Sequence, residues 1–171
     1  EEYDKWNYTL QWQYEELKYL DQEMYSFNPV VNSVLSGCIG KIKGRDIKVE
    51  TDINIPGDVE FFDGDFGTLF SNLVDNAIEA CIKIEKRENR KIKVTLKRTK
   101  QFYSIEMTNS VADEKLCEPI LNQNRQSEYT TKAEKKYHGL GLASMRSTVE
   151  KYGGMMKMSC ENGMFLLHIV V

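Results

Sequence analysis

Residues 65–83 read DFGTLFSNLVDNAIEACIK, and the rest of the chain is best understood outward from this segment. At about 100° per residue, its apolar residues fall on one broad helical face and its polar residues on a narrow opposite stripe. The apolar face comprises Phe66, Leu69, Phe70, Leu73, Val74, Ala77, Ala80, Cys81 and Ile84. The polar stripe comprises Asp65, Thr68, Asn72, Asp75, Asn76, Glu79 and Lys83. This pattern predicts an amphipathic helix over residues 65–86 that packs on a core.

The polar stripe contains two carboxamides and two carboxylates, Asn72, Asp75, Asn76 and Glu79, which helical spacing by three and four brings together. Asn and Asp are poor residues for a helix interior because their side chains compete for backbone hydrogen bonds. A solvated face is more easily built from Glu, Lys and Gln. Oxygen ligands for a hard cation explain the choice, and an ordinary surface stripe of charge pairs explains it about equally well.

Composition indicates one compact globular domain with a short appendage, because the chain has 171 residues, 41% hydrophobic and 29% charged. The net charge of −3 gives no electrostatic case for binding nucleic acid. No apolar run approaches the roughly 20 residues of a membrane span, and no segment resembles a signal peptide. The four cysteines are scattered without a C-x-x-C motif, so Cys38 and Cys81 are read as buried thiols in a reducing cytoplasm.

Residues 3–24 have the alternating spacing of three and four that is typical of a coiled-coil seam. The seam positions are Tyr3, Trp6, Leu10, Gln13, Leu17, Leu20 and Met24. About three heptads are borderline for a free dimer. A single amphipathic helix on its own domain is one interpretation, and the end of a longer helical dimer is the favoured one. Because the chain starts with Glu1, we expect it to be a fragment of a longer protein.

Two further helices are predicted. The first covers 28–43, with Asn28 as N-cap, Pro29 at the first helical position and Gly44 at the end. The second covers 139–152 and ends at a pair of glycines.

Alternating apolar residues predict the strands. A strand is expected over 47–55, a hairpin from 92–96 and 103–107, and a second hairpin over 156–171. The Asn162-Gly163 dipeptide is a strong signal for a tight turn in the last of these.

Residues 122–137, NQNRQSEYTTKAEKKY, contain no aliphatic side chain larger than Ala133, so this segment is expected to be mobile and not ordered without nucleotide. The sequence His138-Gly139-Leu140-Gly141-Leu142 follows, directly before a predicted helix. Glycines in this place let the backbone and the helix N-terminus approach an anion. A plain loop-to-helix turn explains them about as well. The motif lacks the Walker P-loop pattern, and no predicted strand runs directly into it, which excludes a Rossmann fingerprint.

The order of these motifs is more specific than any one of them. The helix NLVDNAIEA is followed by a strand ending Met107-Thr108-Asn109, by Thr130-Thr131-Lys132 in the mobile segment and by HGLGLAS. Over residues 28–171 this order resembles the ATP-binding domain of the GHKL superfamily, which joins gyrase, a heat-shock chaperone, histidine kinases and mismatch-repair ATPases. Asn72-x-x-x-Asn76-Ala77 is similar to its N box and Gly139-Leu140-Gly141-Leu142 to its second glycine box. The wording LVDNAIEAC with HGLGL is most similar to sensor histidine kinases of the peptide-pheromone (quorum-sensing) and citrate-sensor type.

The resemblance implies an α/β two-layer sandwich, with a mixed, mostly antiparallel sheet and helices on one face. It also implies a site for ATP and Mg²⁺. Asn76 would ligate the metal, and Asn72 would support the phosphates or the water shell of the metal. Asp75 and Glu79 would orient the waters of the metal or hold the helix in place.

The resemblance places other residues around the nucleotide. Gly139 and Gly141, with Leu140 and Leu142 in the same box, would bring backbone amides to the phosphates. Thr131 and Lys132 would close over them, with Lys132 as a point charge. His138 would donate to a phosphate or would pack at a hinge, and both interpretations stay open.

Two departures from the superfamily pattern are informative. Most members have Asp-x-G where this chain has Asn109-Ser110-Val111. An Asn carbonyl can still accept the adenine amino proton, although Asn109 is also a common turn residue. Hydrolytic members have Glu at the position of Asn72, and Asn cannot act as a general base, which favours transfer of phosphate over hydrolysis.

The resulting hypothesis is the catalytic ATP-binding domain of a two-component sensor histidine kinase. His138 and His168 do not lie in an acceptor pattern, so the acceptor histidine is expected upstream of this chain, in the same or the partner subunit. Residues 1–25 would be the end of a helical homodimerisation region and 26–171 the catalytic domain. A response regulator would be the downstream partner, and the chain would be the cytoplasmic part of a membrane-bound bacterial sensor. A serine kinase of the anti-sigma-factor type and a degenerate partner-binding module without kinase activity are the alternatives.

Overall fold

The computed structural model describes residues 24–56, 64–127 and 140–171. Its centre is a five-stranded sheet in the order β1-β2-β3-β5-β4. The strands are β1 (Lys48–Asn54), β2 (Lys91–Thr99), β3 (Phe102–Ser110), β4 (Met155–Glu161) and β5 (Met164–Val170). The β1–β2 pair is parallel and the other three pairs are antiparallel. The prediction of a mixed, mostly antiparallel sheet is therefore confirmed.

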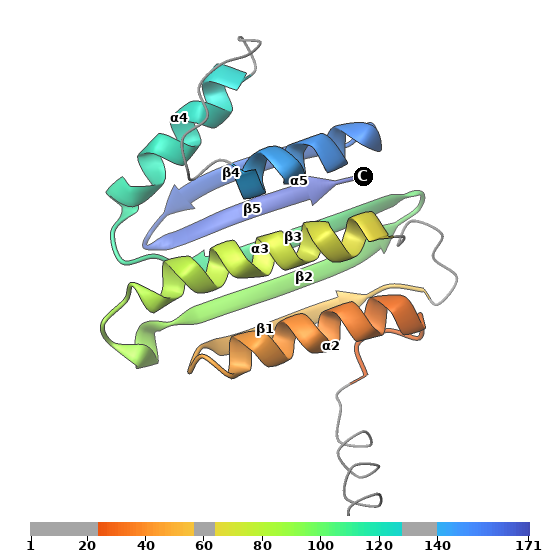
Figure 1. Ribbon diagram of the computed structural model, residues 1–171, viewed down its shortest axis with the longest axis horizontal. Helices are drawn as coiled ribbons and strands as arrows, with labels where there is room; N and C mark the ends of the chain where they lie inside the picture. Colours follow the sequence, from red (N-terminus) through yellow and green to blue (C-terminus); the bar gives the residue numbers. More distant parts are fainter. Residues whose placement is uncertain (1–23, 57–63, 128–139) are drawn as a thin grey trace, which may run out of the picture.

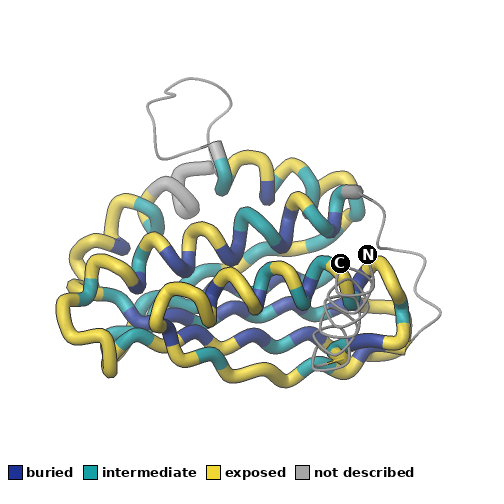
Figure 2. The backbone as a smooth tube through the Cα atoms, turned by 60° about the horizontal axis from the view of Figure 1, so that its bottom comes forward, coloured by how far each residue is buried: buried dark blue, intermediate teal, exposed yellow. Residues whose placement is uncertain are grey.

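Three helices lie side by side across one face of this sheet (Figure 1). They are α2 (Pro29–Lys43), α3 (Gly64–Ile82) and α5 (Leu140–Lys151). Helix α4 (Glu118–Ser127) lies beyond the end of this layer, and two short 3₁₀ turns, η1 (Arg87–Asn89) and η2 (Glu114–Cys117), complete the described elements. Figure 2 shows the two layers from the side, with the buried segments facing one another between them. The predicted two-layer sandwich is confirmed.

The apolar face of α3 forms the centre of the core. Phe66, Leu69, Phe70, Leu73, Val74, Ala77 and Cys81 are all buried. The inward side chains of the strands meet them, namely Ile92, Val94, Leu96, Ile105, Met107, Leu167 and Ile169. Alternation along β2 and β3 puts these residues on the helix-covered face and leaves the other face of the sheet open. Burial on this scale stabilises the domain mainly through the hydrophobic effect.

Local signals fix the ends of several elements as predicted. The side chain of Asn28 accepts hydrogen bonds from the backbone N–H groups of Val30 and Val31, which caps α2. In the closing hairpin, Asn162 and Gly163 have φ values of 53° and 71°, the left-handed conformation that a tight two-residue turn requires. Gly154 follows α5 where only a glycine fits, since a Cβ there would lie 2.4 Å from the carbonyl oxygen of Val170.

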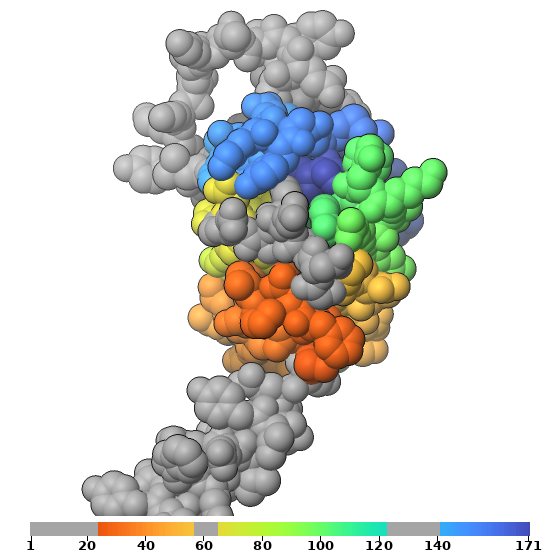
Figure 3. All heavy atoms as spheres, turned by 90° about the vertical axis from the view of Figure 1, so that its right-hand side faces the viewer, coloured from red at the N-terminus to blue at the C-terminus, as the bar shows by residue number. Residues whose placement is uncertain are grey.

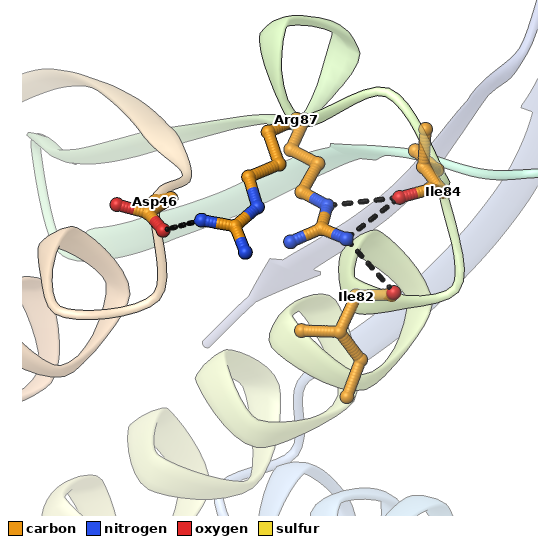
Figure 4. A network of polar contacts seen from close by, with 5 residues as sticks. Asp46, Ile82, Ile84 and Arg87 are labelled. Atoms are coloured by element: carbon orange, nitrogen blue, oxygen red, sulfur yellow. Dashed lines mark hydrogen bonds and ion pairs between the residues drawn. The ribbon is translucent and has the colours of Figure 1, made fainter.

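Helix α3 ends earlier than predicted, at Ile82 and not at residue 86. The guanidinium group of Arg90 donates to the carbonyl oxygen of Ile82 at 3.2 Å and to that of Ile84 at 3.0 and 2.7 Å. It thereby satisfies backbone acceptors at the end of the helix. Figure 4 shows this contact beside the ion pair between Arg87 and Asp46, which links η1 to the loop after α2 at 2.7 Å.

Helix α4 was not predicted, and it includes residues 122–127 of the segment expected to be mobile. The side chain of Asp113 accepts from the N–H of Lys115 and starts η2, and buried Cys117 anchors the point where α4 begins. The rest of that segment lies outside the described residues, as do residues 1–23 with almost all of the predicted coiled-coil seam. Within the parts that the structure describes, no helix is long and apolar enough to cross a membrane.

Candidate functional site

The polar stripe of α3 is directed away from the sheet, as the helical pattern predicts. Asp75, Asn76 and Glu79 are exposed, and Asn72 is half-buried. The four side chains therefore share one surface of the helix, over a core that fixes the helix in place.

Lysines pair with the two carboxylates of this stripe. Lys41 of α2 forms an ion pair with Asp75, and Lys83, the residue just after the end of α3, pairs with Glu79 at 3.1 Å. In contrast, no described residue forms a hydrogen bond with the carboxamide of Asn72 or of Asn76. These pairings favour a helix-holding role for Asp75 and leave the two carboxamides as the groups available to a ligand.

The first turn of α5 lies against Asn76. A Cβ on Gly141 would be 3.7 Å from Oδ1 and 3.8 Å from Nδ2 of Asn76. Because Gly141 has no side chain, a space about the size of one methyl group stays open between the backbone of α5 and the carboxamide of Asn76. Because Leu140, Gly141 and Leu142 are the first residues of α5, their N–H groups have no partner within the helix. The structure therefore places Gly141, the second glycine of the HGLGL motif, next to Asn76, the second asparagine of the α3 stripe.

A contact at the opposite ends of the same two helices keeps them in this alignment. Asp65, at the start of α3, accepts from Nζ of Lys151 at 2.5 Å and from the hydroxyl of Tyr152 at 2.9 Å, both at the end of α5. Figure 3 views the end of the domain at which α2 and α3 begin and α5 stops. The hydrogen bonds from Lys151 and Tyr152 lower the pKa of Asp65. Because α3 and α5 run antiparallel, this contact at one end helps to hold Gly141 opposite Asn76 at the other.

Asn109 occupies a buried place at the end of β3, where it is 3% exposed. It pairs with Ile92 and Phe165 in the sheet and shares the helix-covered face with Met107, so it is not a turn residue. Its Nδ2 donates to the carbonyl oxygen of Ser110 at 3.1 Å. That bond uses one of the two N–H donors of the carboxamide within the protein, and Oδ1 remains as an acceptor.

The neighbours of Asn109 form a buried polar network. The hydroxyl of Ser110 accepts from the N–H of Lys91 at 2.9 Å, and the thiol of Cys81 lies 3.5 Å from that hydroxyl. Cys81 is buried, as predicted, and burial raises the pKa of its thiol. Cys38 was also predicted to be buried but is half-buried on α2.

Several predicted site residues lie outside the described part of the chain: Thr131, Lys132, His138 and Gly139. Their roles stay predictions. Among the described residues, no group of three or more His, Cys, Asp or Glu side chains is placed to hold a metal ion. His168 is half-buried on the open face of the sheet, 2.9 Å from the hydroxyl of Ser104 and on the opposite face from α3.

Sequence reasoning missed two features of this region. The pairing of Asp65 with Lys151 and Tyr152 spans more than 80 positions, and no local pattern indicates it. The side-by-side placement of Cys117 and Cys160 has no signal in their spacing either.

A family model described as a GHKL domain matches residues 63–171, more than half of the chain. The chain belongs to the GHKL domain family. Solved histidine kinase domains have the same fold. The catalytic domain of the histidine kinase ThkA, in a nucleotide-free form, is 23% identical with a TM-score of 0.60, and the match covers 83% of this chain and 90% of that one.

Two further solved structures are more distant in sequence. The mycobacterial sensor histidine kinase MprB is 16% identical with a TM-score of 0.54, over 82% of this chain and 94% of that one. The histidine kinase domain of the blue-light activated kinase EL346 from Erythrobacter litoralis is 14% identical with a TM-score of 0.57, over 84% of this chain and 60% of that one. None of the curated proteins matches the chain. Family and fold together define a GHKL domain like those of histidine kinases, and this family implies ATP binding.

Proposed function

We propose that the chain is the catalytic ATP-binding domain of a two-component sensor histidine kinase, of the peptide-pheromone or citrate-sensor type. The observation that carries the proposal is the contact between Gly141 and Asn76. There, the first turn of α5, whose N–H groups have no partner within the helix, faces a carboxamide to which no described residue forms a hydrogen bond, and a glycine keeps the space between them open. A triphosphate with its metal needs both kinds of group, because amides bind the anion and the carboxamide oxygen suits a hard cation.

Asn76 would hold Mg²⁺ through Oδ1, and Asn72, one helical turn earlier, would support the phosphates or the water shell of the metal. When bound, Mg²⁺ neutralises charge on the triphosphate. The donor set fits this ion, since Mg²⁺ keeps several waters and needs few protein oxygens. Asp75 and Glu79, already paired with lysines, would help to keep the helix and its charge balance in place.

The backbone N–H groups of Gly141 and Leu142 would donate to phosphate oxygens. Gly139, His138, Thr131 and Lys132 would complete the phosphate site, with Lys132 as a positive point charge. These contacts would position the terminal phosphate and neutralise charge, so this domain supplies no covalent chemistry of its own.

Asn109 would bind the adenine ring. Its Oδ1 can accept a hydrogen bond, and its Nδ2 already donates to the carbonyl oxygen of Ser110, so the side chain suits the amino group of adenine. An oxo group at the same ring position would place two acceptors against one another, which would select against guanine.

Asn72 supports transfer over hydrolysis, because a carboxamide cannot take a proton from water. The acceptor histidine would lie outside this chain, on the helical dimerisation region to which residues 1–25 belong, and a response regulator would receive the phosphate. The domain would work in the cytoplasm as part of a membrane-bound sensor.

Calorimetric titration with a non-hydrolysable ATP analogue, with and without Mg²⁺, tests the site. We expect Mg²⁺-dependent binding that Asn76→Ala weakens at least tenfold, by roughly 1.4 kcal/mol. Asn89→Ala is the matched control, because Asn89 is an exposed asparagine in η1, beyond the end of α3. Absence of binding at millimolar analogue, or equal affinities for both variants, would refute the nucleotide site.

Transfer to histidine is tested on the full-length protein. Phosphohistidine is labile in acid and phosphoserine is stable, so acid treatment of the phosphorylated protein distinguishes the two kinds of kinase. Survival of the label in acid would contradict the histidine kinase proposal and leave the nucleotide site intact.

A further inference from the structure

Cys117 and Cys160 lie next to one another, although 43 positions separate them in the chain. Cys117 ends η2, and Cys160 lies in β4, opposite Phe165 of β5. Their sulfur atoms are 2.8 Å apart, and both are free thiols. We infer that these two residues form an oxidative modification site, a dithiol that low-molecular-weight disulfides such as oxidised glutathione convert to an intramolecular disulfide.

The geometry requires little movement. A disulfide bond is about 2.05 Å long, so the two sulfur atoms need to approach by less than roughly 1 Å. A second contact holds the same elements together, because the N–H of Gly163 donates to Oε1 of Glu114 at 2.6 Å. This contact fixes η2 to the turn between β4 and β5. The protein framework therefore holds the two thiols within reach of each other before any oxidant arrives.

The two thiols differ in access. Cys160 is half-buried and can be reached from solvent, whereas Cys117 is only 3% exposed. Burial, the hydrogen bond with Cys160 and the nearby carboxylates of Glu114 and Asp113 raise the pKa of Cys117 to about 12. Cys117 thus stays a protonated thiol in the reduced protein, and Cys160 is the residue that meets the oxidant first.

The exchange then proceeds in two balanced steps. Cys160 loses its proton and its sulfur attacks one sulfur of oxidised glutathione, which forms a mixed disulfide and releases one glutathione thiolate. Cys117 then loses its proton and attacks Sγ of Cys160, which breaks the mixed disulfide and releases the second glutathione. Two protein thiols are oxidised to one disulfide, one molecule of oxidised glutathione is reduced to two thiols, and the released thiolates take up the two protons.

The other two cysteines provide an internal comparison. The thiol of Cys81 is fully buried and bonded to the Ser110 and Lys91 network. Cys38 is half-buried like Cys160, but no other sulfur lies within bonding distance of it among the described residues. Cys38 can therefore take up one glutathione but cannot complete the second step. The disulfide between Cys117 and Cys160 would also close a covalent loop around α4, α5 and the HGLGL motif.

The test uses the 171-residue chain in buffers of reduced and oxidised glutathione, followed by alkylation and tryptic mass mapping. Trypsin separates all four cysteines, which fall in peptides 19–41, 49–83, 116–125 and 158–171. We expect peptides 116–125 and 158–171 to be joined, with the loss of two hydrogen atoms, and dithiothreitol to separate them. When half of the molecules contain the disulfide between Cys117 and Cys160, less than about a tenth of Cys38 should carry glutathione. The reason is that only the pair can complete its oxidation by an intramolecular second step.

Cys160→Ser and Cys117→Ser should each abolish the joined peptides, and Cys160→Ser protects the test against a folding defect at the more buried position. Cys38→Ser is the matched control and should leave the joined peptides unchanged. The inference is overturned if Cys160 remains in a mixed disulfide with glutathione and Cys117, once the protein is unfolded, still reacts with the alkylating reagent. It is also overturned if peptides 116–125 and 158–171 join only between two copies, which appear as a dimer on a non-reducing gel. These outcomes are independent of whether the chain binds nucleotide.

Discussion

Gly141→Ala tests the proposed site most directly, because it changes the space in the site without disturbing the fold. The added methyl group would lie 3.7 Å from Oδ1 and 3.8 Å from Nδ2 of Asn76, which is ordinary van der Waals contact. The free protein therefore accommodates it. Alanine also favours helix over glycine by up to about 1 kcal/mol in a helix interior, and by less in the first turn. The free energy of unfolding should stay the same or rise slightly.

Nucleotide affinity should change in the opposite direction. The methyl group fills the one-atom space between the start of α5 and Asn76, so a phosphate oxygen can no longer approach both the N–H groups and the carboxamide. Loss of one charge-assisted hydrogen bond costs about 1.5–3 kcal/mol, which corresponds to roughly 10- to 100-fold in affinity. A variant that is as stable as the parent but binds at least tenfold more weakly is the expected result.

Urea unfolding and calorimetric titration with the ATP analogue measure the two quantities separately. Gly40→Ala is the matched control, because Gly40 lies within α2 and a Cβ there meets nothing within 4 Å. That control should raise stability by roughly 0.5–1 kcal/mol and leave affinity unchanged. The reasoning would be refuted if Gly141→Ala bound the ATP analogue with an affinity within about twofold of the parent, a difference that ordinary titrations resolve.

Three further predictions concern the framework that holds the site. Gly154→Ala should destabilise the domain by roughly 3 kcal/mol and lower Tm by roughly 10 °C, because its Cβ would meet a backbone carbonyl, that of Val170, at 2.4 Å; a thermal scan with unchanged Tm contradicts this. Asp65 has a lowered pKa, so its contribution to stability is present above the unfolded pKa near 3.9 and disappears as pH falls through the folded pKa. In urea unfolding experiments from pH 7 to pH 3, the free energy of unfolding should therefore fall less steeply toward low pH for Asp65→Asn than for the parent protein. Parallel curves for the two proteins would argue against this contribution. Asp75→Asn should cost less than about 1 kcal/mol, since Asp75 and Lys41 are 50% and 47% exposed; a larger loss in the same unfolding assay would show that this pair is structural.

Features that depend on neighbours in sequence were predictable. The face and stripe of α3 follow from helical spacing, the cap of α2 from Asn28, and the last hairpin from Asn162-Gly163. In each case the residues that determine the structure lie within a few positions of one another. The same holds for the candidate carboxamides, which one helix brings together whatever surrounds it.

Features that depend on contacts across the fold were not predictable. Helix α3 stops at Ile82 because Arg90, eight positions later, binds carbonyls at its end. Helix α4 has only Ile120 and Leu121 as larger aliphatic side chains, too few for a periodic pattern, and its start depends on the burial of Cys117 against β4. No pattern in sequence alone placed Gly141 beside Asn76; the resemblance to a known family implied only that both would lie around the same nucleotide.

The choice of asparagine at positions 72 and 76 has a physical reason in this arrangement. The surface around α3 carries Lys41 and Lys83, and these lysines pair with the carboxylates of the stripe, Asp75 and Glu79. An ionised carboxylate at either asparagine position would compete for the same lysines and would add negative charge where a triphosphate is proposed to bind. A carboxamide presents a similar oxygen without the charge, so no lysine is drawn to it and its oxygen stays available. The stripe thus separates into carboxylates that pair with lysines, Asp75 with Lys41 of α2 and Glu79 with nearby Lys83, and carboxamides without a partner among the described residues, which is the division expected if the proposed ligand binds at the carboxamides.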